Sequence, residues 1–448
     1  MKTKPLTFLL SLTFLFLFSG SSVVFGDDFQ DVVDALERQD YKEAHRLWKL
    51  SAEQGDADAQ YNLGLMYEKG QGVPQDYKEA VRWYRLAAEQ GDVDAQFNLG
   101  VMFEKGRGVP QDDKEAFNWF RLAAEQKNDL AQHALGVIYH DGKKGIVKDD
   151  KEAFKWYQLA AKQGLAQAQY NLGLMYAHRQ GVPQDYKKAF KWFRLAADQG
   201  DPEGQYNLGV LHDFGQGVPQ DYKEAIRWYR LSAEQGLAKA RNNLGVMYYA
   251  GKGVSQDTKE AIKWYQLAAD QGDPEGQYNL GVSHDEGKGV PQDYKEAVKW
   301  YRLSAEQGYA QSQYNLGLMY EEGKGVSQDT KEAIKWWKLA AEQGFAKAQY
   351  NLGLMYYEGR GGSQDDKEAV KWFRLSAEQG FAQAQLNLGV MYATGKGIPQ
   401  DYMLAHMWIN LAASKGVEYA IENRNIVEKR MSPSQIEEAQ RLARNWKP

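Results

Sequence analysis

The sequence of 448 residues contains no cysteine. A chain without cysteine forms no disulfide, cysteine-ligated zinc site or iron–sulfur cluster, and it has no thiol nucleophile. It also lacks a strong excess of one charge, since 55 Lys and Arg stand against 60 Asp and Glu, giving a net charge of −5. A protein whose main partner is nucleic acid usually has a basic excess, so this balance argues against such a partner. Hydrophobic residues nevertheless make up 43 % of the chain, which excludes wholesale disorder.

Apolar runs long enough to cross a membrane are missing after the first 25 residues. At the start of the chain, Lys2 and Lys4 precede an apolar run from Leu6 to Phe18, and small residues follow it. A basic segment, an apolar segment and small residues in this order are typical of a secretory signal. We predict that residues 1–26 are a signal peptide cleaved after Gly26, and that the protein is periplasmic or secreted. An uncleaved membrane anchor is the alternative.

One unit of 36 residues is repeated ten times. The first copy runs from Asp56 to Gly91 and the last ends at Gly416, and one copy, residues 128–164, carries an extra residue in its loop. A tryptophan at the same position marks every copy: Trp83, Trp119, Trp156, Trp192, Trp228, Trp264, Trp300, Trp336, Trp372 and Trp408. A period of this length indicates an array of structural repeats rather than a single globular core.

The sequence pattern of each unit predicts two helices. In the first copy, Ala59 and Leu63 share one apolar stripe at helical spacing, and Gly70 ends that helix because glycine adopts the left-handed conformation at little cost. Asp76 is placed to cap the second helix, whose apolar stripe includes Trp83. The helical phase favours a core position for the tryptophans over a carbohydrate-stacking surface.

Two short helices cannot bury their apolar faces alone, so neighbouring pairs must stack. The predicted fold is all-α: a right-handed superhelical α-solenoid of stacked antiparallel helix hairpins. Residues 27–55 are predicted to form an N-terminal capping hairpin, residues 56–416 the ten repeats, and residues 417–448 C-terminal capping helices. Gly64 recurs inside the first helix of every copy, which indicates close backbone approach between packed helices.

The repeat resembles the Sel-one-like repeat (SLR) family, whose members are related to tetratricopeptide repeats. The resemblance covers about 390 residues and rests on three motifs at period 36: Ala59-Leu63-Gly64-Tyr67, Gly70-Gly72-Val73-Asp76 and Glu79-Ala80-Trp83. Departures are few; Arg179 replaces the first loop glycine of one copy, and Gly362 replaces the loop valine of another. The resemblance implies an adaptor or scaffold whose curved surface gathers other proteins, and exported bacterial members of the family are linked to the cell envelope.

Sequence motifs for catalysis or metal binding are lacking. His133 and His140 are seven residues apart on one predicted helix, about 10.5 Å along its axis, which is too far for one zinc ion. No pattern combines a nucleophile, a base and an orienting group. We therefore expect a protein that is not an enzyme and that has no cofactor and no metal.

The first helix of each unit carries the candidate binding residues. Nine of the ten copies repeat an asparagine beside the apolar stripe: Asn62, Asn98, Asn171, Asn207, Asn243, Asn279, Asn315, Asn351 and Asn387. A tyrosine precedes it in six of these: Tyr61, Tyr170, Tyr206, Tyr278, Tyr314 and Tyr350. Side-chain amides in a column can donate to and accept from the backbone of an extended peptide, while tyrosine offers apolar contact. In the alternative, each asparagine bonds a neighbouring carbonyl and the tyrosines pack between repeats.

The predicted function is therefore that of an exported scaffold that binds protein or peptide partners on its concave surface, with no nucleic-acid partner. Two alternatives remain open. The protein can be a binding module for peptidoglycan or another envelope polysaccharide, or a cell-wall hydrolase, which would need a converging pair of carboxylates. The oligomeric state is not predicted.

Overall fold

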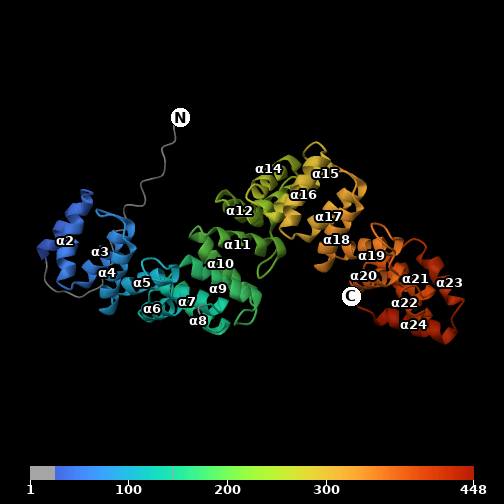
Figure 1. Ribbon diagram of the computed structural model, residues 1–448, viewed down its shortest axis with the longest axis horizontal. Coiled ribbons are helices and arrows are strands. Elements are labelled where there is room, and N and C mark those ends of the chain that lie inside the picture. Colours follow the sequence, from blue (N-terminus) through green and yellow to red (C-terminus); the bar gives the residue numbers. More distant parts are fainter. Residues whose placement is uncertain (1–25, 144, 448) are drawn as a thin grey trace. The chain divides into compact units, whose positions relative to one another are not determined.

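The computed structural model describes residues 26–143 and 145–447 (Figure 1). These residues form 24 α-helices, and the described part of the chain contains no strand. The helices pair into antiparallel hairpins that stack on one another, so the predicted all-α solenoid is confirmed. The predicted signal peptide lies outside the described residues except for Gly26, where the first helix begins.

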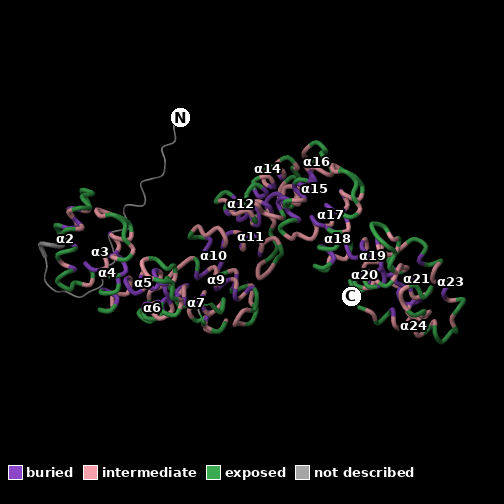
Figure 2. Tube along the Cα trace, viewed as in Figure 1, coloured by how far each residue is buried: buried purple, intermediate pink, exposed green. Residues whose placement is uncertain are grey.

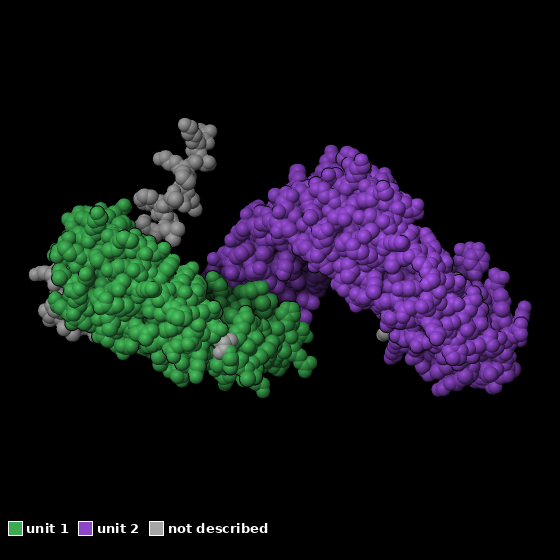
Figure 3. Space-filling view, in the orientation of Figure 1, with its two compact units in different colours: residues 1–184 green, residues 185–448 purple. Residues whose placement is uncertain are grey.

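The chain forms two compact units, residues 1–184 and 185–448 (Figure 3). The helices of the first unit are α1 Gly26–Glu37, α2 Tyr41–Glu53, α3 Ala57–Lys69, α4 Tyr77–Glu89, α5 Val93–Lys105, α6 Asp113–Glu125, α7 Asp129–Asp141, α8 Asp150–Lys162 and α9 Ala166–His178.

The helices of the second unit are α10 Tyr186–Asp198, α11 Pro202–Phe214, α12 Tyr222–Glu234, α13 Ala238–Ala250, α14 Thr258–Ala269, α15 Pro274–Glu286, α16 Tyr294–Glu306, α17 Ala310–Glu322, α18 Thr330–Glu342, α19 Ala346–Glu358, α20 Asp366–Glu378, α21 Ala382–Thr394, α22 Tyr402–Ser414, α23 Ala420–Glu428 and α24 Pro433–Asn445. Within the repeats, odd-numbered helices are the first helices of their hairpins and even-numbered helices are the second.

The helix ends follow the sequence signals. The Asp76 carboxylate accepts hydrogen bonds from the backbone N–H groups of Lys78 and Glu79, which satisfies two of the unpaired donors at the start of α4. Gly70 ends α3 in the left-handed conformation, with φ of 69°. Arg179 adopts the same conformation, with φ of 59°, where other copies have glycine, so the loop keeps its geometry despite the substitution.

Within each unit, a first helix packs on the second helix of its own repeat and on the second helix of the preceding repeat. In the first unit, α5 contacts α6 and also α4; in the second unit, α13 contacts α14 and also α12. The buried residues lie along these contacts (Figure 2). Each hairpin thus completes its core only with its neighbours, as expected for stacked repeats.

The tryptophans belong to this core, as predicted. Trp83, Trp228, Trp300, Trp336, Trp372 and Trp408 are buried, and Trp119, Trp156, Trp192 and Trp264 are half-buried. Several of them reach the preceding repeat; for example, Trp300 of α16 packs with Tyr265 of α14 and with Leu280 of α15 in its own repeat. These tryptophans therefore make contacts between repeats.

The repeated glycine inside the first helix serves a packing role that differs in part from the predicted one. A Cβ atom added at Gly64 would lie 2.6 Å from the Tyr84 ring of the paired helix. At Gly64 the close approach is therefore between the backbone of α3 and an aromatic ring of α4. At Gly100, Gly245 and Gly389 an added Cβ would also lie 3.0 to 3.3 Å from a backbone oxygen of the paired helix, so the predicted backbone approach occurs in those copies. Another close backbone approach occurs in the loop, where a Cβ at Gly72 would lie 2.1 Å from the carbonyl oxygen of Tyr41.

The last two helices pack on the final repeat. Ser432 caps α24, and the Gln435 side chain accepts from the Ser432 N–H, which completes a capping box. Both α23 and α24 contact α22, and the Trp408 and Trp446 rings meet edge to face at 5.8 Å. These contacts cover the apolar side of α22.

Candidate binding surface

All nine predicted asparagines lie on first helices, and all are half-buried. The six predicted tyrosines precede them on the same helices and are half-buried too. The structure therefore gives each unit of the chain a row of amides, with a phenol next to the amide on six of the ten first helices.

Most of the amides are tied to a tyrosine of the preceding repeat. The Asn98 amide lies near the hydroxyl groups of Tyr61 and Tyr84, both from the repeat before it. In the second unit, the Asn243 amide donates to the Tyr206 hydroxyl oxygen at 3.5 Å. Further pairs of this kind are Asn315 with Tyr278 and Tyr301, Asn351 with Tyr314, and Asn387 with Tyr350. The amides thus form an inter-repeat ladder that the sequence analysis did not foresee.

Four asparagines have other partners. Asn62 and Asn207 donate to the carbonyl groups of Asp58 and Glu203 on their own helices, at 2.8 and 2.9 Å. These two bonds are the local backbone contacts of the alternative interpretation. Asn171 lies 2.9 Å from a ring nitrogen of His133, and Asn279 donates to the Asn242 oxygen at 2.8 Å. An amide has two donor hydrogens and a carbonyl oxygen, so one such bond leaves groups that can meet a ligand.

The tyrosine rings pack between helices, and in one region they form a row with other rings. Tyr278 is tilted against Tyr301 of its own repeat, with ring centroids 6.1 Å apart. It also meets Tyr309 of the next repeat at 5.4 Å. The same contact with the following repeat recurs for Tyr314 with Phe345 at 5.3 Å and Tyr350 with Phe381 at 5.2 Å. The sequence signal for this row was an aromatic first residue in three consecutive copies.

Burial keeps the phenols of this surface protonated. Loss of water around the ring, with a smaller effect of the nearby Glu275 carboxylate, raises the pKa of Tyr206 to about 12. The pKa of Tyr61 is raised for the same reason, with help from Asp94 and Asp92. These tyrosines therefore act as neutral hydrogen-bonding groups rather than as acids or bases near neutral pH.

Four first helices lack the tyrosine–asparagine pair: α5 has Phe97, α7 has His133 and Ala134, α13 has Asn242 and α21 has Leu386 at these positions. In α13, Asn242 stands where most copies have an aromatic residue, and it is buried. Its amide donates to the Glu275 carboxylate at 3.1 Å and accepts from Asn279. A short polar network thus takes the place of an aromatic contact at α13.

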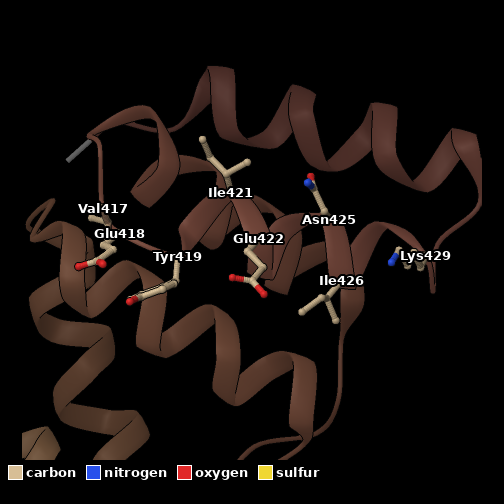
Figure 4. Close-up of a pocket in the computed structure, with 8 residues that line it drawn as sticks. All are labelled: Val417, Glu418, Tyr419, Ile421, Glu422, Asn425, Ile426 and Lys429. Atoms are coloured by element: carbon tan, nitrogen blue, oxygen red, sulfur yellow. The ribbon is translucent and has the colours of Figure 1, made fainter.

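A hollow near the end of the chain lies apart from the predicted residues. Eight side chains beside α23 line it (Figure 4), and Tyr419, Ile421 and Ile426 are more than half exposed. Its charged groups are Glu418, Glu422 and Lys429, with no histidine, serine or threonine among the lining residues. That set offers no nucleophile activated by a base.

The described residues contain neither a cluster of metal-binding side chains nor a helix that could span a membrane. No group of three or more His, Cys, Asp or Glu side chains is arranged to hold a metal ion within residues 26–143 and 145–447. In the same part of the chain, every helix is too short or too polar to cross a bilayer.

The repeated hairpins, the core shared between repeats and the regular rows of side chains define an α-solenoid with an extended surface of repeated side chains. The chain belongs to the Sel1 repeat family. The family model matches eleven segments: residues 34–56, 57–92, 93–128, 129–165, 166–201, 202–237, 238–273, 274–309, 310–345, 346–381 and 382–417. The first of these falls in the region predicted as a capping hairpin. The resemblance drawn from the sequence motifs is therefore confirmed.

Solved structures agree with this assignment. The chain is similar to a protective antigen present in uropathogenic Escherichia coli strains, which displays an SLR fold: the two are 39 % identical with a TM-score of 0.75, over 91 % of this chain and 87 % of that one. It is also similar to a Sel1 repeat protein from Oxalobacter formigenes, at 33 % identity and a TM-score of 0.55, over 77 % of this chain and 99 % of the other. No curated protein matches the sequence. Sel1 repeats of this kind suggest protein–protein interaction.

Proposed function

We propose that the protein is a non-enzymatic exported scaffold that binds protein or peptide partners along its first helices, in the bacterial cell envelope. The observation that carries the proposal is the ladder of half-buried amides and phenols. It repeats with nearly the same chemistry along the first helices, which suits an extended chain with a repeating backbone. Each amide keeps donor or acceptor groups beyond its one internal bond, and neutral phenols beside it add apolar contact.

The proposal is tested by replacing three amides, N207A, N243A and N279A, in one variant. We expect capture of envelope proteins to fall about tenfold, since each lost hydrogen bond contributes about 1 kcal/mol and not all three meet every partner. Helical content and the melting temperature should stay close to those of the parent. A matched control is K295A/K331A/K367A, which removes three exposed cations from the first turns of second helices.

The extract used for capture distinguishes the classes of partner. Treating it with protease before mixing should abolish capture, and treating it with a muramidase should not. If the triple variant melts much lower yet captures as much per folded molecule, the asparagines are structural and the proposal fails.

A polysaccharide ligand is the second candidate, and the aromatic row favours it. The ring pairs Tyr278–Tyr309, Tyr314–Phe345 and Tyr350–Phe381 offer flat apolar faces next to amides, a combination suited to sugars as well as to peptides. Capture that survives protease treatment but is lost after muramidase treatment would show that the partner is peptidoglycan rather than a protein.

The export signal supports the proposed location. Its basic start, apolar run and small residues are those of a cleaved secretory segment. Fractionation of bacteria that express the full chain should place it outside the cytoplasm, and mass spectrometry of the purified protein should find Asp27 as its first residue. An intact Met1 in a membrane fraction would indicate an uncleaved anchor instead.

A further inference from the structure

Six of the seven second helices in the unit formed by residues 185–448 expose one leucine at the same position; in α22 the equivalent Leu411 is half-buried. The six members are Leu195, Leu231, Leu267, Leu303, Leu339 and Leu375, with exposed fractions between 38 and 46 %. We call them the leucine row. Single exposed leucines are common on protein surfaces, but the same one in six successive repeats is a continuous feature.

Charged side chains flank every member of this row in the same order. Four residues before each leucine stands an exposed cation: Lys191, Arg227, Lys263, Lys299, Lys335 and Lys371. Three residues after it stands an exposed carboxylate: Asp198, Glu234, Asp270, Glu306, Glu342 and Glu378. Residues three and four apart lie on one face of a helix, so each second helix presents a cation, a leucine and a carboxylate in line.

The second helices lie side by side, which turns these residues into three parallel stripes. Arg194 of α10 contacts the Trp228 ring of α12 at 5.2 Å. Farther along, Trp264 of α14 packs against Tyr229 of α12, and Trp336 of α18 packs with Tyr301 of α16. Because equivalent helices run in the same direction, the six cations lie along one edge of the leucine row and the six carboxylates that follow the leucines lie along the other. All of these cations except Lys191 also pair with a glutamate three residues earlier, which lies on the cation side.

In the other unit the pattern is complete on α2, with Arg46, Leu50 and Glu53, and on α4, with Arg82, Leu86 and Glu89. It breaks on α6 and α8, where Asn118 takes the place of the cation before Leu122 and Lys162 takes the place of the carboxylate after Leu159. Leu122 and Leu159 remain exposed, at 38 and 44 %. The longest unbroken run is thus that of α10, α12, α14, α16, α18 and α20.

We propose that this face binds a second copy of the same chain. A two-fold axis that lies in the face, parallel to the leucine row, turns the two copies face to face and reverses the helix direction, so the cation stripe of one copy meets the carboxylate stripe of the other while leucine meets leucine. The spacing matches automatically because both surfaces have the same repeat. Any other partner would need the same period and the opposite order of charges.

The ion pairs that the cations already make within their own helices do not prevent them from pairing with carboxylates of a second copy. Arg227, for example, pairs with Glu224 on its own helix at 3.1 Å, and both side chains are largely exposed. Such surface pairs contribute little to stability and are readily shared or exchanged. A membrane surface fits less well, because the carboxylate stripe lies as close to the leucines as the cation stripe and would be repelled by anionic lipids.

The test is sedimentation equilibrium of the purified protein over a range of concentrations. We expect a reversible dimer whose dissociation constant rises about 100-fold in L267E/L303E, since each leucine that is no longer buried costs about a factor of ten. The matched control L122E/L159E changes exposed leucines of the other unit and should leave the dimer intact. A wild-type protein that is monomeric at 100 µM, or a dimer unaffected by L267E/L303E, overturns the proposal.

Charge exchange gives a second test that does not depend on the leucines. The variant K263E/K299E/K335E makes both stripes acidic, and the variant D270K/E306K/E342K makes both basic. Each alone should be monomeric, and an equimolar mixture should form a heterodimer. Self-association of either variant as strong as that of the wild type, or a mixture that stays monomeric, contradicts the two-fold arrangement. Flotation of wild-type protein with anionic vesicles would point to lipid instead.

Discussion

At the scale of single residues, glycine inside a helix is explained by the ring that covers it. In the repeat that contains α19, a Cβ atom added at Gly353 would lie 2.6 Å from the Phe373 ring of the paired helix, closer than such atoms approach in real structures. Glycine weakens an isolated helix by about 1 kcal/mol relative to alanine. The packing of the aromatic ring more than offsets that cost.

We therefore expect G353A to lower the free energy of unfolding by about 2 kcal/mol, because overpacking outweighs the gain in helix propensity. The control is G362A in the same unit, where a Cβ would meet no atom within 4 Å and the backbone is ordinary. It should change stability by less than about 0.5 kcal/mol. Urea denaturation of both variants checks the difference; equal stabilities would show that the ring moves freely.

At the scale of helices, the caps of α5 and its neighbours bring carboxylates together. Asp92 caps α5 by accepting from the Ala95 N–H at 2.6 Å, while Asp94 and Asp58 lie near it. Partial burial, with these two charges adding to it, raises the pKa of Asp92 to about 6. A carboxyl group with a raised pKa in the folded state stabilises the fold below its unfolded pKa, near 4, and that contribution is lost as pH rises through about 6.

Replacing Asp92 by Asn keeps the capping oxygen and removes the charge, as the natural cap Asn128 shows by accepting from the Ala131 N–H. D92N should therefore be more stable than the parent at pH 7.5, by about 1 kcal/mol once solvent screening is allowed for, and equal to it near pH 4. Thermal unfolding at both pH values measures this. The exposed cap variant D112N should show no gain, and a D92N protein less stable at pH 7.5 would refute the electrostatic account.

At the scale of the whole molecule, stability depends on contacts between successive repeats. The apolar surfaces of the terminal repeats must therefore be covered by other elements that shield them from water. The helix α24 provides it at the C-terminus, where Trp446 packs on Trp408 and Ala443 and Met407 join the same cluster. Without α24 the last repeat would present a large apolar surface to water.

Deletion of residues 432–448 should lower the melting temperature and cause aggregation on heating, because the apolar side of α22 loses its cover. Light scattering during a thermal scan measures both effects. The control E437A changes an exposed residue of α24 and should behave as the parent does. A truncated protein that stays soluble and melts at the same temperature would show that α24 is dispensable as a cap.

The hairpin repeat could be predicted closely because its signals are local. The caps at Asp76 and Ser432 and the left-handed turn at Gly70 act within four residues of sequence, where backbone geometry alone decides the outcome. The burial of the tryptophans could also be predicted, since helical phase places them on the apolar stripe.

The candidate site was only partly predictable. The column of asparagines was visible at period 36, but the partner of Asn98 is a hydroxyl group one repeat earlier, and the register between stacked hairpins sets that contact. The aromatic row of Tyr314 and Phe345 depends on the same register.

By itself, the sequence determined the number of hairpins, the ends of their helices and the residues that must be buried, because these follow from short-range preferences repeated many times. Only the tertiary structure decided which side of each helix faces a neighbour and which faces water. Leu303 is the clearest case: it lies between buried residues in the sequence, yet its side chain is 40 % exposed because no neighbouring helix covers that side of α16. Stacking geometry, which no single repeat contains, therefore sets the surfaces on which both the proposed partner site and the proposed dimer rest.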